Sequence, residues 1–306
     1  MAGVIFMRQV VTAIMMAILF TASPFLVKTS LPEEKENRFL PETISVYDAE
    51  KKTVESVSAE DYIAGVVFAE MPPSFHEEAL KAQAVAARSY LARHLFLQYG
   101  RENHSGADIC TDGSHCMAFR IEPENEEYQK IRSLVSETAG ELLLFDDKPA
   151  ECVFHSSSFL TTESALNLWS FDYPYLVSVL SPEKAAESTL TFSPEDFADF
   201  LGVKTSGDPG KWIEKTEKEA NGRTKSLSVC GKTLSGNDFR FAFGLPSTFF
   251  KITFEENSFR IDCRGYGHGV GMSQYGADTL ARMGFDYSEI LSHYYPGTVL
   301  KKDAGE

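Results

Sequence analysis

The residue best suited to acid–base chemistry in this sequence is Glu70, a carboxylate on the apolar side of a predicted helix. The run SAEDYIAGVVFAEMPP predicts a helix from about Ala59 to Glu70, capped by Ser58 and ended by two prolines. Helical spacing puts Glu70 on the same stripe as three apolar residues, Ile63, Val66 and Val67. Apolar surroundings raise the pKa of a carboxyl group, so Glu70 is expected to hold a proton near neutral pH and to donate it. The alternative is a solvated acid on the last helical turn.

Arg88 is a candidate on the next helix, which an S-x-x-E capping box at Ser74 and Glu77 is predicted to begin. Arg88 follows Ala84 by four residues and precedes Leu91 by three, so we expect it to point inward. The alternative is an arginine whose stem packs while its charged head reaches solvent.

A third unusual segment has glycine at every second position over residues 265–271. Such spacing clears one face, against which backbone or a ligand can lie, while Tyr266 and His268 project from the other. The chain then enters a helix near Ser273, where N–H donors and the side chains of Ser273 and Gln274 could hold sugar hydroxyls or acetamido groups. A phosphate loop is a poor fit, because the Walker lysine is missing. For His268 the alternative is a structural histidine bonded to a nearby carbonyl.

Four side chains between residues 100 and 120 could bind a tetrahedral zinc ion: His104, Cys110, His115 and Cys116. Four protein ligands leave no open coordination position, so this zinc would be structural. A disulfide between Cys110 and Cys116, or free thiols, is the alternative. Apart from this zinc, no cofactor is expected.

Hydropathy and charge indicate where the protein is located and which partners it binds. Residues 10–27 form a nearly uncharged apolar run, so we expect residues 1–28 to be an uncleaved transmembrane anchor and residues 29–41 a linker. The positions of Arg8 and Lys28 indicate that the anchor is oriented with the domain that follows it outside the cytoplasm. The formal net charge of −15 argues against nucleic acid as a partner and is compatible with a glycan.

The order of predicted elements indicates an α+β domain over residues 42–300, in which helices and antiparallel strands form a cleft. The predicted strands are 43–47, 53–57, 141–147, 150–158, 175–181 and a hairpin within 249–265, and further predicted helices are 125–138 and 194–202.

These segments resemble the stage II sporulation protein D family of endospore-forming bacteria, which includes amidase-enhancer proteins. The resemblance covers about residues 42 to 300. It rests on YIAGVVFAEMP, ALKAQAVAARSYLARH, FHSSS, PYLVSV and RGYGHGVGMSQYGA. Two positions depart from the family pattern: Phe159-Leu160 replaces a common glycine pair, and Met117 and Phe119 replace a frequent Gln and Tyr.

The resemblance implies a membrane-attached lytic transglycosylase that cleaves peptidoglycan strands stripped of stem peptides during engulfment. It matches Glu70 to the catalytic acid and Arg88 to an active-site arginine that orients the carboxylate or binds substrate. It also implies substrate binding by Tyr266, His268, Ser273, Gln274, Tyr275 and Ser156. The implied partners are the stage II sporulation proteins P, an amidase, and M, a membrane scaffold.

A single acid suits this reaction, because the C6 hydroxyl of N-acetylmuramic acid can attack C1 itself, whereas most glycosidases need two carboxylates. The alternatives are a muramidase that uses water and a non-catalytic wall-binding amidase enhancer. A zinc amidase lacks an open metal position, and a serine hydrolase built on residues 156–158 lacks a nucleophile elbow.

Overall fold

The computed structural model describes residues 39–98, 104–113 and 115–303. The chain divides into two compact units, Met1–Asn37 and Arg38–Glu306, and every element below belongs to the second. The predicted anchor over residues 1–28 lies outside the described residues, as does most of the predicted linker over 29–41. Among the described residues, no helix combines the length and the apolar character needed to cross a membrane.

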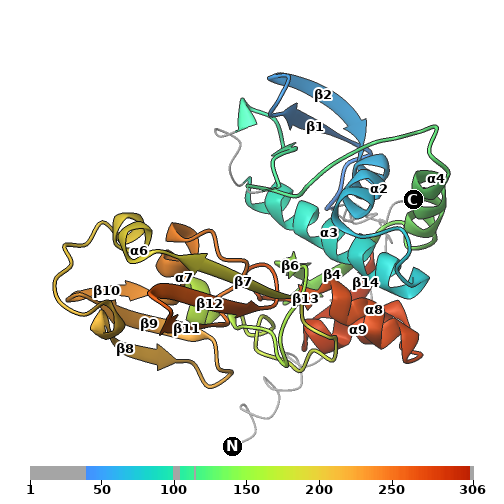
Figure 1. The fold of residues 1–306 in the computed structure, drawn as a ribbon. Helices are drawn as coiled ribbons and strands as arrows, with labels where there is room; N and C mark the ends of the chain where they lie inside the picture. Colours follow the sequence, from blue (N-terminus) through green and yellow to red (C-terminus); the bar gives the residue numbers. More distant parts are fainter. Residues whose placement is uncertain (1–38, 99–103, 114, 304–306) are drawn as a thin grey trace, which may run out of the picture. The chain divides into compact units, whose positions relative to one another are not determined.

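The N-terminal part begins with a hairpin that leads directly into a helix, as the sequence predicts. β1 (Thr43–Asp48) pairs antiparallel with β2 (Thr53–Ser58), and the short β3 (Ile109–Cys110) pairs parallel with β1. Ser58 ends β2 and caps α2 (Ala59–Glu70), since its hydroxyl accepts the N–H of Asp61 at 3.4 Å. α3 (Glu77–Leu97) packs beside α2, and both contact α4 (Glu126–Glu137), as Figure 1 shows.

The remaining strands form four small sheets. β4 (Glu141–Phe145) lies between β5 (Lys148–Pro149) and β14 (Val299–Lys302), and β6 (Phe154–His155) pairs parallel with β13 (Met272–Ser273). The other two sheets are antiparallel. Their orders are β11 (Phe250–Glu255), β12 (Ser258–Arg264), β7 (Glu187–Phe192), and β10 (Lys232–Ser235), β9 (Thr224–Val229), β8 (Ile213–Lys218).

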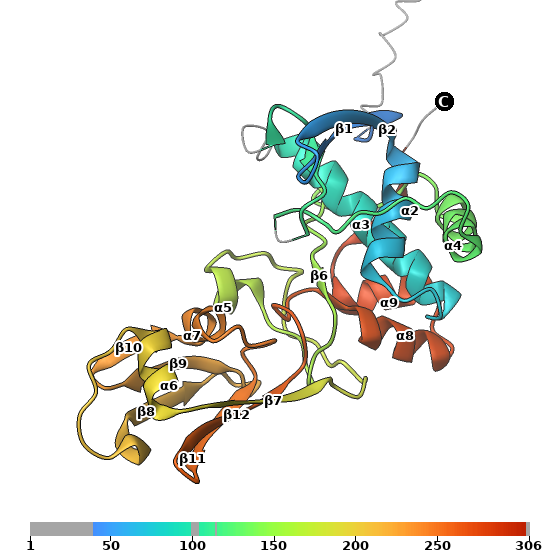
Figure 2. The same ribbon diagram turned by 45° about the horizontal axis from the view of Figure 1, so that its top comes forward.

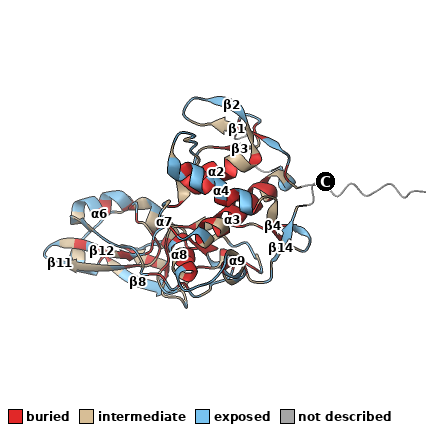
Figure 3. Ribbon diagram, turned by 90° about the vertical axis from the view of Figure 1, so that its right-hand side faces the viewer, coloured by how far each residue is buried: buried red, intermediate tan, exposed pale blue. Residues whose placement is uncertain are grey.

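The shorter helices are α5 (Ala165–Trp169), α6 (Pro194–Leu201), α7 (Gly236–Ala242), α8 (Gln274–Arg282) and α9 (Tyr287–Tyr294), with a 3₁₀ turn at Pro209–Lys211. Two hydrophobic cores result. The larger surrounds α2 and α3, most of whose residues are buried (red in Figure 3), and receives α8 and α9. The smaller lies under α6 and α7, beside the three-stranded sheets in Figure 2, where the rings of Phe197 and Phe259 stack at 3.9 Å.

The α+β class is confirmed, and so are the bounds of α2 and the hairpin before it. Three local predictions are wrong. His76, not Ser74, caps α3, because the ring of His76 accepts the N–H of Glu78. Residues 175–181 form no strand, and of residues 150–158 only Phe154–His155 form a strand, β6, because the backbone hydrogen bonds of these runs do not continue as a ladder. α3 ends at Leu97, where Gln98 adopts a left-handed backbone conformation and caps the helix.

Candidate active site

Glu70 is the last residue of α2, and its carboxylate is partly buried between two other segments of the chain. Its Oε1 accepts the backbone N–H of Ala118 at 2.8 Å, and its Oε2 accepts from Nε2 of Gln274 at 3.4 Å. Burial raises the pKa of Glu70 above its ordinary value, although both hydrogen bonds act in the opposite direction. Within the described residues, no other ionisable group contributes to this shift. The direction of the pKa shift predicted from the apolar stripe is therefore confirmed.

The loop that carries Ala118 is held against α2 by close packing. The N–H of Arg120 bonds to the carbonyl of Gly65 at 3.2 Å, and the ring of Phe119 stacks on Tyr62 with centroids 4.9 Å apart. A Cβ at position 65 would lie 2.5 Å from the Phe119 ring, so glycine is needed there. No local sequence pattern predicts this contact, because it depends on how a distant loop folds back.

Gln274 reaches Glu70 from the first turn of α8. Ser273 caps this helix by accepting the N–H of Gly276 at 3.2 Å, and its hydroxyl donates to Oε1 of Glu183 at 2.5 Å.

The carbonyl of Ser156 accepts from the N–H of Tyr275 at 3.0 Å and from the Ser273 hydroxyl at 3.3 Å. Ser273 is fully buried, so its hydroxyl positions α8 and is closed to solvent. Gln274 thus contacts the acid, while Ser156 and Ser273 support it.

The alternating glycines pack tightly against the segment 153–158. All four glycines from 265 to 271 have positive φ, and a Cβ at Gly271 would lie 2.0 Å from the Val153 carbonyl oxygen. At Gly269 the Cβ would lie 2.5 Å from the Arg223 guanidinium. Of the two interpretations of this spacing, the structure shows backbone packing.

The aromatic residues of the same segment differ in their surroundings. His268 donates from Nε2 to the Phe154 carbonyl at 2.8 Å and accepts the N–H of Val270 at Nδ1. Burial lowers the pKa of His268 to about 4, so it is neutral and held in place, as expected of a structural histidine. Tyr266 and Tyr275 remain 59% and 45% exposed, and the Tyr275 ring packs edge-on against Phe75. These two tyrosines are available for contact with a ligand.

Arg88 lies at the opposite end of α2 from Glu70. Its Nε and Nη2 donate to the two carboxylate oxygens of Glu60 at 2.9 and 2.7 Å, and its Nη1 donates to the Glu141 carbonyl. Glu60 stands ten residues before Glu70, a separation of about 15 Å along a helix. The inward orientation predicted for Arg88 is confirmed, because the side chain is fully buried. The structure does not bring Arg88 to the candidate acid, since Glu60 occupies its guanidinium.

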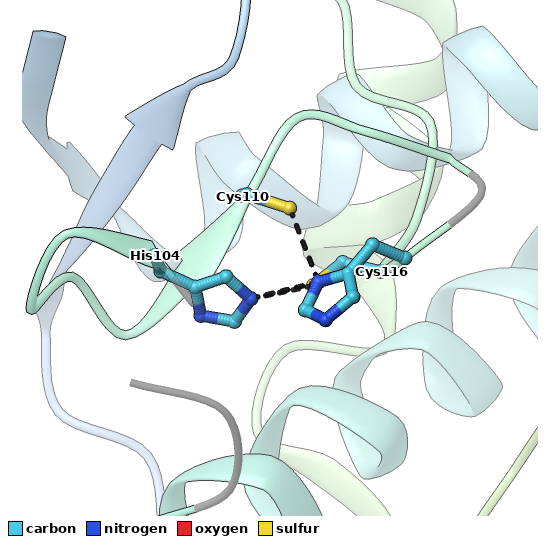
Figure 4. A group of neighbouring side chains, drawn as sticks. His104, Cys110 and Cys116 are labelled. Atoms are coloured by element: carbon cyan, nitrogen blue, oxygen red, sulfur yellow. Dashed lines mark hydrogen bonds between the residues drawn. The ribbon is translucent and has the colours of Figure 1, made fainter. Parts of the chain in front are cut away.

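The four residues predicted to bind zinc converge. The ligand atoms of His104, Cys110, His115 and Cys116 all lie within 4.8 Å of one another. The sulfur of Cys116 lies 3.3 Å from Nε2 of His104, and both cysteines are free thiols, so the alternative disulfide is not formed. Figure 4 shows His104 and Cys110 directed into the same space as Cys116. The separations of 3.0–3.6 Å among these side chains are close to the edges, about 3.3–3.8 Å, of a tetrahedron with metal–ligand bonds of about 2.0–2.3 Å.

Similar proteins identify the family. A family model described as "Stage II sporulation protein" matches residues 47–145. The stage II sporulation protein D of Bacillus subtilis (strain 168) is 35% identical over 276 residues, which cover 86% of this chain and 80% of that protein. The chain belongs to the stage II sporulation protein D family.

Two further relatives show how far the family extends. The stage II sporulation protein D of Bacillus amyloliquefaciens is 34% identical over 88% of this chain and 81% of its own length. A protein named "Amidase enhancer" from Bacillus subtilis (strain 168) is 26% identical over 78% of this chain but only 40% of its own length. This family member is therefore a sporulation protein, and one of its relatives is named as an enhancer of an amidase.

Three buried charged residues, Glu163, Glu183 and Arg223, support the site, and the sequence alone does not identify them. Glu183 accepts from the N–H of Ser158 at 2.7 Å as well as from Ser273. Arg223 reaches the Ser158 hydroxyl at 3.5 Å, and Asn221 donates to Glu163 at 3.0 Å. Because each lies in a loop or turn without periodicity, no local pattern marks it as buried.

Proposed function

We propose that this family member is a peptidoglycan lytic transglycosylase. It cleaves between N-acetylmuramic acid and N-acetylglucosamine in strands free of stem peptides, and leaves 1,6-anhydro-muramoyl ends during engulfment. The proposal rests on Glu70, a partly buried carboxyl with a raised pKa and with no other ionisable group among the described residues acting on it. Protonated Glu70 first donates its proton to the glycosidic oxygen.

The second half of the reaction uses the same residue as a base. After the bond to the leaving sugar breaks, the Glu70 carboxylate accepts the proton of the muramoyl C6 hydroxyl as that oxygen bonds to C1. The nucleophile is part of the substrate, so the ring closure is intramolecular and needs no second carboxylate. The Ala118 N–H and the Gln274 amide stabilise the carboxylate form between these steps.

The cleft expected beside Glu70 remains part of this proposal. A cavity of about 730 Å³ is lined by residues of β7, β8, β11 and β12 and does not include Glu70. The exposed rings of Tyr266 and Tyr275 favour a sugar-binding surface along the glycine segment instead.

A structural zinc ion bound by His104, Cys110, His115 and Cys116 is part of the same proposal. The ion would cross-link the loop, and it would have no open coordination position for a reaction. Cys116 is two residues from Ala118, so an ordered loop keeps the Ala118 N–H directed at Glu70. The full chain purified without chelators should contain about one zinc per molecule, and Cys110→Ser should lose it.

The proposal also includes a membrane anchor over residues 1–28, an extracytoplasmic domain, and association with stage II sporulation proteins P and M. Membrane attachment is tested by flotation of the full chain with phospholipid vesicles. A variant that lacks residues 1–28 should stay at the bottom of the gradient.

A non-catalytic amidase enhancer is the second candidate, supported by the relative of that name. Replacement of Glu70 separates the two. Glu70→Gln should lower cleavage of peptide-free glycan by about 10²-fold or more, as expected for loss of a general acid. Glu50→Gln, an exposed acid in the β1–β2 turn, is the matched control and should cleave normally. Unimpaired cleavage by folded Glu70→Gln would exclude Glu70 as the acid, and amidase stimulation that survives Glu70→Ala would favour the enhancer.

A further inference from the structure

A cavity of about 480 Å³ lies beside Tyr266, at the start of the glycine segment. Its lining includes Arg240 of α7, Tyr266, Glu187 and the backbone of residues 244–246. This volume falls within the range of small-molecule sites, about 300–1,000 Å³. Tyr266 is 59% exposed, so one aromatic ring of the lining is open to solvent.

Arg240 is a half-buried cation without an anionic partner. Its Nε donates to the Leu245 carbonyl at 3.1 Å, and its guanidinium lies 5.5 Å from the centre of the Phe241 ring. Throughout residues 39–98, 104–113 and 115–303, no carboxylate lies within ion-pair distance of Arg240. Glu187 of the same cavity pairs instead with Arg264, at 3.3 Å. Burial lowers the pKa of Arg240, but an arginine stays charged at neutral pH.

An unpaired, partly desolvated guanidinium favours an anionic ligand. Its planar fork matches a carboxylate in two parallel hydrogen bonds, which are stronger than bonds between neutral groups. Tyr266 lines the same cavity as Arg240, so its hydroxyl is a second donor for the same ligand. The Tyr266 ring suits the apolar face of a sugar.

A continuous run of backbone contacts connects this cavity to Glu70. Tyr266 exchanges two hydrogen bonds with Ser157, at 2.8 and 3.0 Å. The adjacent Ser156 accepts the N–H of Tyr275, and the preceding residue, Gln274, contacts Glu70 through its side chain. The cavity and the candidate acid are therefore linked through one packed segment of the chain.

We propose that Arg240, with Tyr266, binds the free lactyl carboxylate of a muramoyl residue and so selects glycan strands that lack stem peptides. In intact peptidoglycan this carboxyl is consumed in the amide bond to the peptide, so the negative charge appears only after the peptide is removed. This inference rests on the proposed function and adds a physical reason for the choice of substrate. The carboxylates of a stem peptide offer the same chemistry and form a separate arm of the test.

Binding is measured with the full chain carrying Glu70→Gln, so that the ligand is not consumed. The ligands are one muramoyl–glucosaminyl oligosaccharide with free lactyl carboxylates, the same oligosaccharide with lactyl carboxamides, one with stem peptides, and a chito-oligosaccharide of equal length. The free carboxylate should bind about tenfold more tightly than the carboxamide, as expected for hydrogen bonds to a charged group.

Adding Arg240→Gln should remove this preference and leave binding of the chito-oligosaccharide unchanged. Arg240→Lys should keep part of the preference, because it retains the charge but not the planar fork. Arg132→Gln is the matched control, since it removes an exposed arginine paired with Asp61 on another helix. Circular dichroism and thermal unfolding establish that each variant is folded, and Tyr266→Phe, which should weaken the preference, replaces any variant that is not.

Two results would overturn the inference: a preference that persists in folded Arg240→Gln, or peptide-bearing glycan that binds as tightly as the free carboxylate and depends equally on Arg240. Neither result depends on cleavage. If the wild type forms no anhydro product while the Arg240-dependent preference is present, the subsite stands and the proposed reaction fails. If anhydro product forms while the preference is absent, the reaction stands and the subsite fails.

Discussion

Burial in the folded protein disfavours the charged form of the Glu70 carboxyl. Because its pKa in the folded protein is raised above its ordinary value of 4.5, the folded state binds the proton more tightly than the unfolded chain. Its contribution to stability is therefore fully present below pH 4.5 and is lost as the pH rises through the folded pKa. The same group must be protonated to start the proposed reaction, so the rate should fall over the same interval.

Glu70→Gln should accordingly be more thermostable than the wild type at pH 8, and this advantage should shrink as the pH falls toward 4. The amide keeps an oxygen that can accept the Ala118 N–H, so the native contact survives. Thermal unfolding of both proteins from pH 4 to 8 measures the difference. An advantage that grows as the pH falls would contradict the raised pKa.

Arg88 should act on stability, because it is fully buried and paired with Glu60. Arg88→Ala should lower the free energy of unfolding by about 3 kcal/mol, since it removes the cation that pairs with Glu60 and the donor to the Glu141 carbonyl. Urea denaturation measures this loss. A variant with wild-type stability but no cleavage would restore the active-site role that the resemblance implies for Arg88.

At the scale of elements, the glycine segment fixes where α8 begins and hence where Gln274 lies. Gly271→Ala should cost about 3 kcal/mol or more, because its Cβ would meet the Val153 carbonyl at 2.0 Å. Gly284 also has positive φ but has open space around a Cβ, so Gly284→Ala should cost only about 1–2 kcal/mol. Equal costs, measured by denaturant unfolding, would show that backbone conformation rather than packing requires glycine in the segment.

The Cys/His loop carries the Ala118 N–H, which lowers the pKa of Glu70. If zinc orders this loop, Cys116→Ser should weaken that bond, raise the pKa of Glu70 further and move the alkaline limb of the pH–rate profile to higher pH. The pH dependence of glycan cleavage, with the zinc content measured in the same preparations, tests this coupling. An unchanged profile after complete loss of zinc would separate the loop from the acid.

Local patterns predicted the elements that local interactions determine. Ser58 and the apolar stripe define α2 and the environment of Glu70, and the spacing of four side chains located the Cys/His cluster. Nothing local could reveal that Glu60 takes Arg88, because that choice depends on how α3 crosses α2. Residues 175–181 have the composition of a strand, yet in the described structure they form only an isolated antiparallel bridge, between Leu180 and Thr161.

At the scale of the whole described unit, buried polar contacts connect elements of the two hydrophobic cores. Asn221 bonds to Glu163, and Arg223 reaches Ser158 in the segment against which the glycines pack. Both Tyr266 and Gln274 depend on this segment, Tyr266 directly and Gln274 through the Ser156 carbonyl. The candidate acid and the proposed carboxylate subsite are therefore held by one continuous structure, and a polymeric glycan is the ligand that would use both.

The central claim is that the substrate supplies its own nucleophile while Glu70 moves the protons. Digestion of defined peptide-free glycan by the full chain in heavy-oxygen water, with product masses measured, tests it most directly. The account predicts muramoyl ends lighter than the hydrolysis product by one water and free of the heavy isotope, and their loss in Glu70→Gln. Reducing muramoyl ends that carry heavy oxygen would contradict it and would identify a hydrolase.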